Sequence, residues 1–126
     1  MSNTVQAEIK KAKARGKARV KQTGEVFTPM DLCLQMVRSI PEEKLIDPNS
    51  TYLDNSCGDG NFLVALLQVL TEEYGHERDH VVNHQLYGVD LMANNIEAVR
   101  ARLGVSGDHP HYVCHDALAY DYSFDG

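Results

Sequence analysis

The sequence predicts a single α/β domain built on a parallel sheet, and three observations support this prediction. The chain has 126 residues, about the length of one domain. Hydrophobic residues make up 43% of it and charged residues 24%, which are ordinary values for a globular protein. Beyond residue 50, the order of the predicted elements is strand, helix, strand, helix, strand, and this alternation produces parallel strands with right-handed crossovers.

The first predicted helix spans residues 30–40, where apolar residues recur at helical spacing. We expect Thr28 to be its N-cap, Pro29 to occupy the first helical position, and Pro41 to close the segment. A polar link through residues 48–50 then leads to the first strand.

The remaining elements follow from short apolar runs and glycine signals. Strands are expected at residues 51–54, 85–90 and 111–114, with one helix whose apolar face covers residues 62–70 and a second at residues 93–103. Gly104 is placed to end the second helix. Residues 76–84 resemble a polar surface connection, because Gly75 interrupts the helical pattern.

The charge is unevenly distributed along the chain. Residues 1–21 hold seven Lys or Arg against one acidic residue, a charge of +6, whereas residues 22–126 sum to −12. This separates a basic N-terminal arm, helical or flexible, from the domain at residues 22–126. The arm can contact nucleic-acid phosphates, an acidic partner, or the acidic domain itself. Its basic residues are Lys10, Lys11, Lys13, Arg15, Lys17, Arg19 and Lys21.

Composition also restricts the class of protein. No apolar run approaches the roughly 20 residues that span a bilayer and no secretory signal is present, so we expect a soluble, cytoplasmic protein without membrane contact. Three widely spaced cysteines argue against a disulfide framework or a zinc ribbon. His76, His80 and His84 would share one face of a helix and could then hold a metal, but a polar surface segment explains them better.

The candidate site begins where the first predicted strand turns into a helix. Glycines at positions 58 and 60 would let the backbone approach a ligand closely, and Asp54 could hold a cationic or hydroxyl group of that ligand. A tight turn alone would also explain the glycines. Asp90 ends the second predicted strand, where an acidic residue either accepts hydrogen bonds from ribose hydroxyls or is an ordinary turn residue. The pattern suits a nucleoside cofactor.

Taken in order, these segments resemble the motifs of S-adenosylmethionine (SAM)-dependent N6-adenine DNA methyltransferases, especially the modification subunits of restriction-modification systems. The resemblance covers residues 24–125. Residues 24–29 are similar to a Phe-x-Thr-Pro segment that lies beside the methionine portion of the cofactor. Asp54 then corresponds to the acid facing the methionine amino group, Asp90 to the ribose-binding acid, and Asp116 to the acid that accepts a hydrogen bond from the adenine amino group.

The resemblance therefore implies S-adenosyl-L-methionine as the cofactor of residues 22–126, which would be the N-terminal half of a methyltransferase domain. Thr28 and Asp116 can also be read as a helix cap and a turn residue. The implied cofactor-binding residues are Phe27, Thr28, Pro29, Asp54, Ser56, Cys57, Gly58, Gly60, Phe62, Asp90, Leu91, Asp116 and Ala117.

For the fold, the resemblance implies a partial Rossmann-like methyltransferase fold with parallel strands in the order 3-2-1 and flanking helices. In the family the first strand lies between the second and the fourth, so one edge of the first strand would be open. Exposed edges attract further strands, and we expect a homo-oligomer or a protein partner to cover this one, with residues 119–124 covering part of it.

One motif of the family is not matched. The catalytic segment of these enzymes is Asn or Asp followed by Pro-Pro and Tyr or Phe, and no two of the four prolines are adjacent. That segment holds the extruded base. We therefore expect a SAM-binding domain that is inactive alone or depends on a partner.

The sequence leaves two other functions open. The first is a non-enzymatic methyltransferase mimic that binds and regulates or inhibits a restriction-modification or other nucleic-acid protein. The second is an enzyme that consumes SAM by hydrolysis or lyase chemistry, but no group of residues in the sequence supports it. The small size and the resemblance suggest a phage or mobile-element gene.

Overall fold

A computed structural model describes residues 28–124 and shows an α/β architecture. The basic arm, Phe27 and the domain boundary expected after residue 21 lie outside the described residues. In chain order the elements are α2 (Met30–Arg38), α3 (Glu42–Ile46), β1 (Tyr52–Asp54), α4 (Asn61–Glu72), α5 (Arg78–His80), the π-helix η2 (Val81–Gln85), β2 (Leu86–Asp90), α6 (Ala93–Leu103) and β3 (Tyr112–Cys114).

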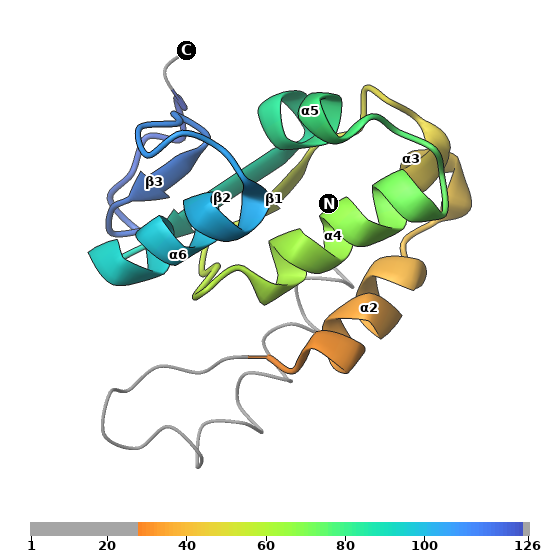
Figure 1. Ribbon diagram of the computed structural model, residues 1–126. Coiled ribbons are helices and arrows are strands. Elements are labelled where there is room, and N and C mark those ends of the chain that lie inside the picture. Colours follow the sequence, from red (N-terminus) through yellow and green to blue (C-terminus); the bar gives the residue numbers. More distant parts are fainter. Residues whose placement is uncertain (1–27, 125–126) are drawn as a thin grey trace.

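The three described strands form one parallel sheet in the order β1-β2-β3. Asp54 pairs with Gly88, and Asp90 pairs with Cys114, so the strands end close to the same level. In Figure 1, α4 and α6 lie across the same side of the sheet, and α2 packs along α4. This arrangement confirms the predicted 3-2-1 order and the partial Rossmann-like fold.

The core lies between the sheet and these helices. α4 buries seven residues, and these include the five apolar residues that helical spacing places on its inner face: Phe62, Leu63, Leu66, Leu67 and Leu70. Leu63, Leu66 and Leu70 are fully buried there, and complete burial of a leucine side chain contributes about 1.5–3 kcal/mol. The apolar face of α4 therefore determines how this helix is oriented against the sheet.

The two prolines around α2 have different roles from those predicted. Pro29 is the N-cap rather than the first helical residue, and its backbone is extended with ψ 145°. Thr28 does not cap the helix, because its side chain is buried in the interior. Pro41 does not end α2, which closes at Arg38; it is the N-cap of α3, a short helix held by the buried Leu45.

The strands and the following connection also differ from the prediction. Each strand begins one residue later than expected, and Gln85 belongs to η2, where its buried amide donates to the Ser50 carbonyl at 3.0 Å. The segment 76–84 was expected to be a polar surface connection, and this was wrong for its second half. Val81 and Val82 are buried in the core, and the chain forms α5 and η2 here instead of an exposed connection.

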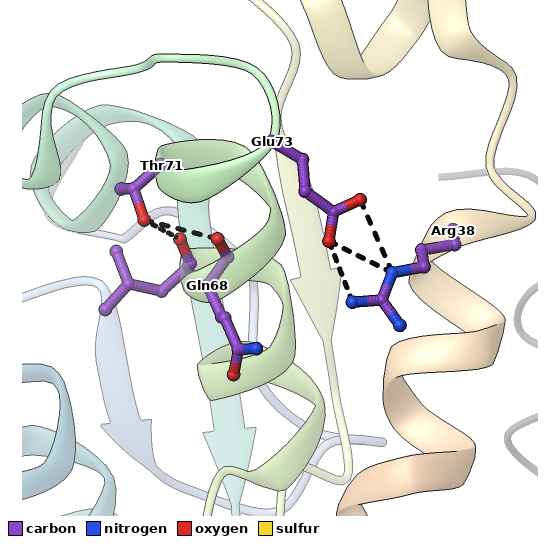
Figure 2. A network of polar contacts seen from close by, with 5 residues as sticks. Arg38, Gln68, Thr71 and Glu73 are labelled. Carbon is purple, nitrogen blue, oxygen red and sulfur yellow. Dashed lines mark hydrogen bonds and ion pairs between the residues drawn. The ribbon is translucent and has the colours of Figure 1, made fainter.

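An ion pair joins the end of α2 to the end of α4, as Figure 2 shows. The Arg38 guanidinium donates from Nε and Nη2 to Glu73 Oε2 at 3.0 and 2.8 Å. Both side chains are well exposed, at 49% and 39%, so the pair orients the two helix ends and contributes little to stability.

Within the described part of the chain, no helix has the length and apolar character needed to cross a membrane. The expected cytoplasmic location stays a prediction.

Candidate functional site

Three acidic residues lie at the carboxyl edge of the sheet. Asp54 is the last residue of β1, Asp90 is the last residue of β2, and Asp116 follows β3 by two residues. The His115 N–H donates to the Asp90 carbonyl at 2.9 Å, so the pairing of β2 with β3 continues to this point. Ligands of open α/β sheets bind outside the carboxyl ends of the strands. The structure therefore brings the three predicted acids to the edge where a ligand would bind.

The glycine loop, residues 55–60, connects β1 to α4 and is folded against the end of β2. Asp54 is 3% exposed, and its Oδ1 accepts the Ser56 N–H at 3.0 Å, which tightens the chain as it leaves the strand. The Cys57 N–H donates to the Val89 carbonyl at 3.1 Å. The Gly60 N–H closes the turn on the Cys57 carbonyl at 2.9 Å. The loop is thus hydrogen-bonded both to itself and to the neighbouring strand.

Gly60 is required by packing as well as by conformation. It is the N-cap of α4 with φ 96°, and a Cβ added there would lie 3.0 Å from Val99 Cγ2 on α6. Gly88 has a similar role that the sequence did not reveal, since a Cβ there would lie 2.9 Å from Leu63 Cδ1. A glycine inside a strand is the signal that could have indicated this close approach.

Asp90 holds the glycine loop with its carboxylate. Its Oδ1 accepts the Gly58 N–H at 3.2 Å, and its Oδ2 accepts the Met92 N–H at 3.0 Å and the Asn95 Nδ2 at 2.9 Å. A carboxylate has about four acceptor positions, so three are occupied by protein donors. A ribose hydroxyl at Asp90 would share this carboxylate with the loop. Asn95, which is 5% exposed on α6, was missed by sequence reasoning.

Thr28 lies beside the start of α4. Its carbonyl accepts the Asn61 Nδ2 at 2.7 Å, which connects the segment before α2 to the end of the glycine loop. Its hydroxyl is buried and has no hydrogen-bond partner among residues 28–124. A buried polar atom without a partner is uncommon and marks a place where a ligand donor or acceptor would be accommodated.

The segment after β3 presents Asp116 in a turn. Asp116 is exposed, and its Oδ1 accepts the Leu118 N–H at 2.9 Å, in agreement with its reading as a turn residue. Four large apolar side chains in the loops after β2 and β3 are exposed: Leu91 at 68%, Met92 at 43%, Leu118 at 98% and Tyr122 at 36%. Exposed apolar side chains beside carboxylates suit a flat ligand that has hydrogen-bond donors on its rim.

The other predicted site residues contribute less directly. Cys57 and Phe62 are buried in the hydrophobic core, so only their backbones are placed to face a ligand. The histidines of the possible metal site are used otherwise: His76 Nε2 and His80 Nε2 each bond a backbone carbonyl at 2.7 Å, those of Leu45 and Pro48. Among residues 28–124, no three His, Cys, Asp or Glu side chains are grouped to hold a metal ion.

Comparison with known families agrees with this geometry. The family model for N-6 DNA methylase matches residues 12–107, which include the glycine loop and the ends of β1 and β2. No curated protein matches the chain. Members of the matched family generally use SAM as the methyl donor. Because the model matches well over half of its residues, this chain belongs to the N-6 DNA methylase family.

Proposed function

We propose that this chain binds SAM at the carboxyl edge of its sheet and serves as the cofactor-binding part of a DNA adenine-N6 methyltransferase. The observation that carries the proposal is the placement of Asp54, Asp90 and Asp116 at the ends of three adjacent parallel strands, beside a glycine loop. Family membership supports the same reaction class.

The chemistry of these residues fits SAM. The cofactor presents hydrogen-bond donors along its length, namely an ammonium group, two ribose hydroxyls and an adenine amino group, and carboxylates accept from all of them. Asp54 would hold the ammonium group, Asp90 the ribose and Asp116 the adenine amino group. The exposed Leu91 and Leu118 would contact the adenine ring. When bound, SAM supplies the methyl group of its sulfonium centre.

The segments around the three acids complete the binding site in this proposal. The backbone of the glycine loop would pass under the cofactor, because it has little side-chain bulk at positions 58 and 60. The segment at Thr28 and Pro29 would lie beside the methionine portion, and the buried Thr28 hydroxyl, which has no partner among the described residues, supports this.

Methyl transfer also requires groups that hold the target base. The Pro-Pro motif that does this in the family does not occur in these 126 residues. We propose that those groups come from a segment or subunit beyond them, so that this chain positions only one of the two reactants. A labelled-methyl assay with adenine-containing DNA should therefore show no transfer by these residues alone.

The cofactor proposal is tested by thermal unfolding and titration calorimetry with SAM. At about one hundred times its dissociation constant, SAM should add roughly 2.7 kcal/mol to the unfolding free energy, which is a shift of several degrees. Asp54→Asn keeps an oxygen for the Ser56 N–H but removes the charge, and it should weaken binding about 10- to 100-fold. Asp79→Asn, on the exposed helix α5, is the matched control and should bind as the wild type does.

The result that contradicts this proposal is an unchanged melting temperature at millimolar SAM. It would favour the second candidate, a non-enzymatic regulator of a restriction-modification or other nucleic-acid protein. The absence of the Pro-Pro motif is the observation that favours this candidate. The expected partner or second copy at the β1 edge, and nucleic-acid contact by the basic arm, stay predictions.

A further inference from the structure

A chain of polar contacts runs from α6 through the start of α4 to the segment before α2. Arg102 Nη1 donates to Asn61 Oδ1 at 2.8 Å and to the Asp59 carbonyl at 3.0 Å. The Asn61 Nδ2 in turn donates to the Thr28 carbonyl at 2.7 Å. One amide side chain therefore bridges two segments that the sequence places 33 residues apart.

These contacts hold the side of the glycine loop that Asp90 does not reach. Asp90 accepts from Gly58, whereas Arg102 binds the carbonyl of the next residue, Asp59, whose carboxylate lies 3.5 Å from the same guanidinium nitrogen. The N-cap of α4 is Gly60, and no side-chain cap hydrogen bond is made there. Arg102 and Asn61 donate to the Asp59 and Thr28 carbonyls, so they hold this end of the loop in place without capping the helix.

The same contacts orient the Thr28 peptide. With its carbonyl held by Asn61, the Thr28 side chain is buried at 6% exposure, and its hydroxyl has no partner in the part of the chain that the structure describes. Burying a hydroxyl without a hydrogen bond costs free energy, and a ligand that bonds it would offset this cost. The bridge thus determines how the Thr28 segment and the glycine loop face each other.

We propose that Arg102 and Asn61 are positioning residues for SAM, which hold the glycine loop and the Thr28 segment in the binding geometry before the cofactor arrives. The proposal rests on the proposed function of this site. Neither residue needs to touch the cofactor. A preorganised loop binds more tightly because the ordering cost of the loop is not added to the cost of binding.

The test measures the SAM dissociation constant by calorimetry for Arg102→Met, Asn61→Ala and the double variant. Each single variant should raise the SAM dissociation constant about tenfold. The double variant should raise it no further than a single variant does, because both changes break the same bridge. Arg102→Lys keeps the positive charge and N–H donors but loses the planar guanidinium, and it should restore part of the affinity. Arg38→Met, which removes the ion pair to Glu73 at the other end of α4, is the matched control and should leave the constant unchanged.

Two further measurements separate positioning from general stability. Unfolding without SAM identifies the temperature at which every variant is folded, and the calorimetry is done there. The amide signals of Gly58 and Gly60 in a nitrogen-15 NMR spectrum should move in Arg102→Met and Asn61→Ala but not in Arg38→Met. Unchanged SAM affinity in folded variants, or fully additive losses in the double variant, would overturn this proposal alone. A wild-type chain that does not bind SAM would overturn the proposed function as well.

Discussion

The loops after β1 and β3 lie at the same edge of the sheet, but they are held in different ways. The glycine loop after β1 depends on residues that are far away in the sequence. Its hydrogen bonds run to Val89 and Asp90 at the end of β2 and to Arg102 on α6. It can therefore adopt its conformation only when the second strand and second crossover helix are in place.

The loop after β3 is held mainly by its own residues. Asp116 accepts from the Leu118 N–H, Tyr122 donates its hydroxyl to the Ala117 carbonyl, and the Phe124 N–H donates to the Tyr120 hydroxyl. Its conformation is strained, since Tyr122 and Phe124 have φ values of 56° and 45°.

The loop after β3 is also connected to the sheet near both of its ends. At its start, the His115 N–H donates to the Asp90 carbonyl at 2.9 Å. The Phe124 ring lies 4.8 Å from the Tyr87 ring on β2. A cavity of about 550 Å³ lies between this part of the chain and β1. We therefore expect the glycine loop to lose its structure when distant contacts are removed, whereas the loop after β3 should tolerate the loss of any one of its own contacts.

The largest expected effect is at Gly60 in the glycine loop. Gly60→Ala combines a positive φ with a contact to Val99, and it should lower the unfolding free energy by roughly 2–4 kcal/mol. Two other glycines separate these causes. Gly75→Ala has the positive φ but no neighbour within 4 Å and should cost about 1 kcal/mol, and Gly107→Ala has neither and should be neutral. Urea unfolding measures all three, and equal losses at Gly60 and Gly75 would show that the Val99 contact has no effect.

A smaller effect is expected from removing the acids that organise the two loops. Asp90→Ala removes an acceptor of three hydrogen bonds, including one to the glycine loop, and should cost about 2–3 kcal/mol. Asp116→Ala removes one bond in an exposed turn and should cost about 0.5 kcal/mol. Thermal unfolding of both variants compares the loops directly. A larger loss for Asp116→Ala would reverse the comparison.

The smallest expected effect is a pH dependence on the β3 side of the sheet. Burial lowers the pKa of His111, whose ring stacks on Tyr87 with centroids 4.0 Å apart, and burial also lowers the pKa of His109. The His109 Nδ1 accepts the His111 N–H at 3.1 Å, and protonation would remove this acceptor. The charges of His111 and Arg100 also disfavour the charged form of His109, and Asp108 favours it.

The sign of this dependence follows from proton binding. Each ring has a lower pKa in the folded state than in the unfolded state, so the unfolded chain binds more protons below about pH 6.5. The unfolding free energy should therefore be largest above that pH and fall as the pH drops through it. Urea titrations at several pH values should show this fall, and His111→Gln should make it shallower. An identical slope in that variant would mean that His111 does not contribute.

Local sequence signals determined several elements without help from the rest of the chain. Both ends of helix α6 agree with the prediction. The signal for its last residue was Gly104, which adopts the left-handed conformation, with φ 72°, that commonly ends a helix. The buried face of α4 followed from leucine spacing alone. The three acids were recognised because strand ends and glycine turns are local features and because their order resembles one family. Their roles toward a cofactor stay predictions.

Only the tertiary structure decided how these parts are held together. The sequence could not show that Asp90 binds Gly58, that Arg102 binds Asn61, or that Pro41 begins a helix rather than ending one. The first two contacts join residues 32 and 41 positions apart, and no local pattern records which distant groups will meet. The role of Pro41 depends on the burial of Leu45, which is a property of the packed core. Local periodicity and capping are encoded residue by residue, whereas the geometry of the site arises when the sheet brings its strand ends and the helix α6 together.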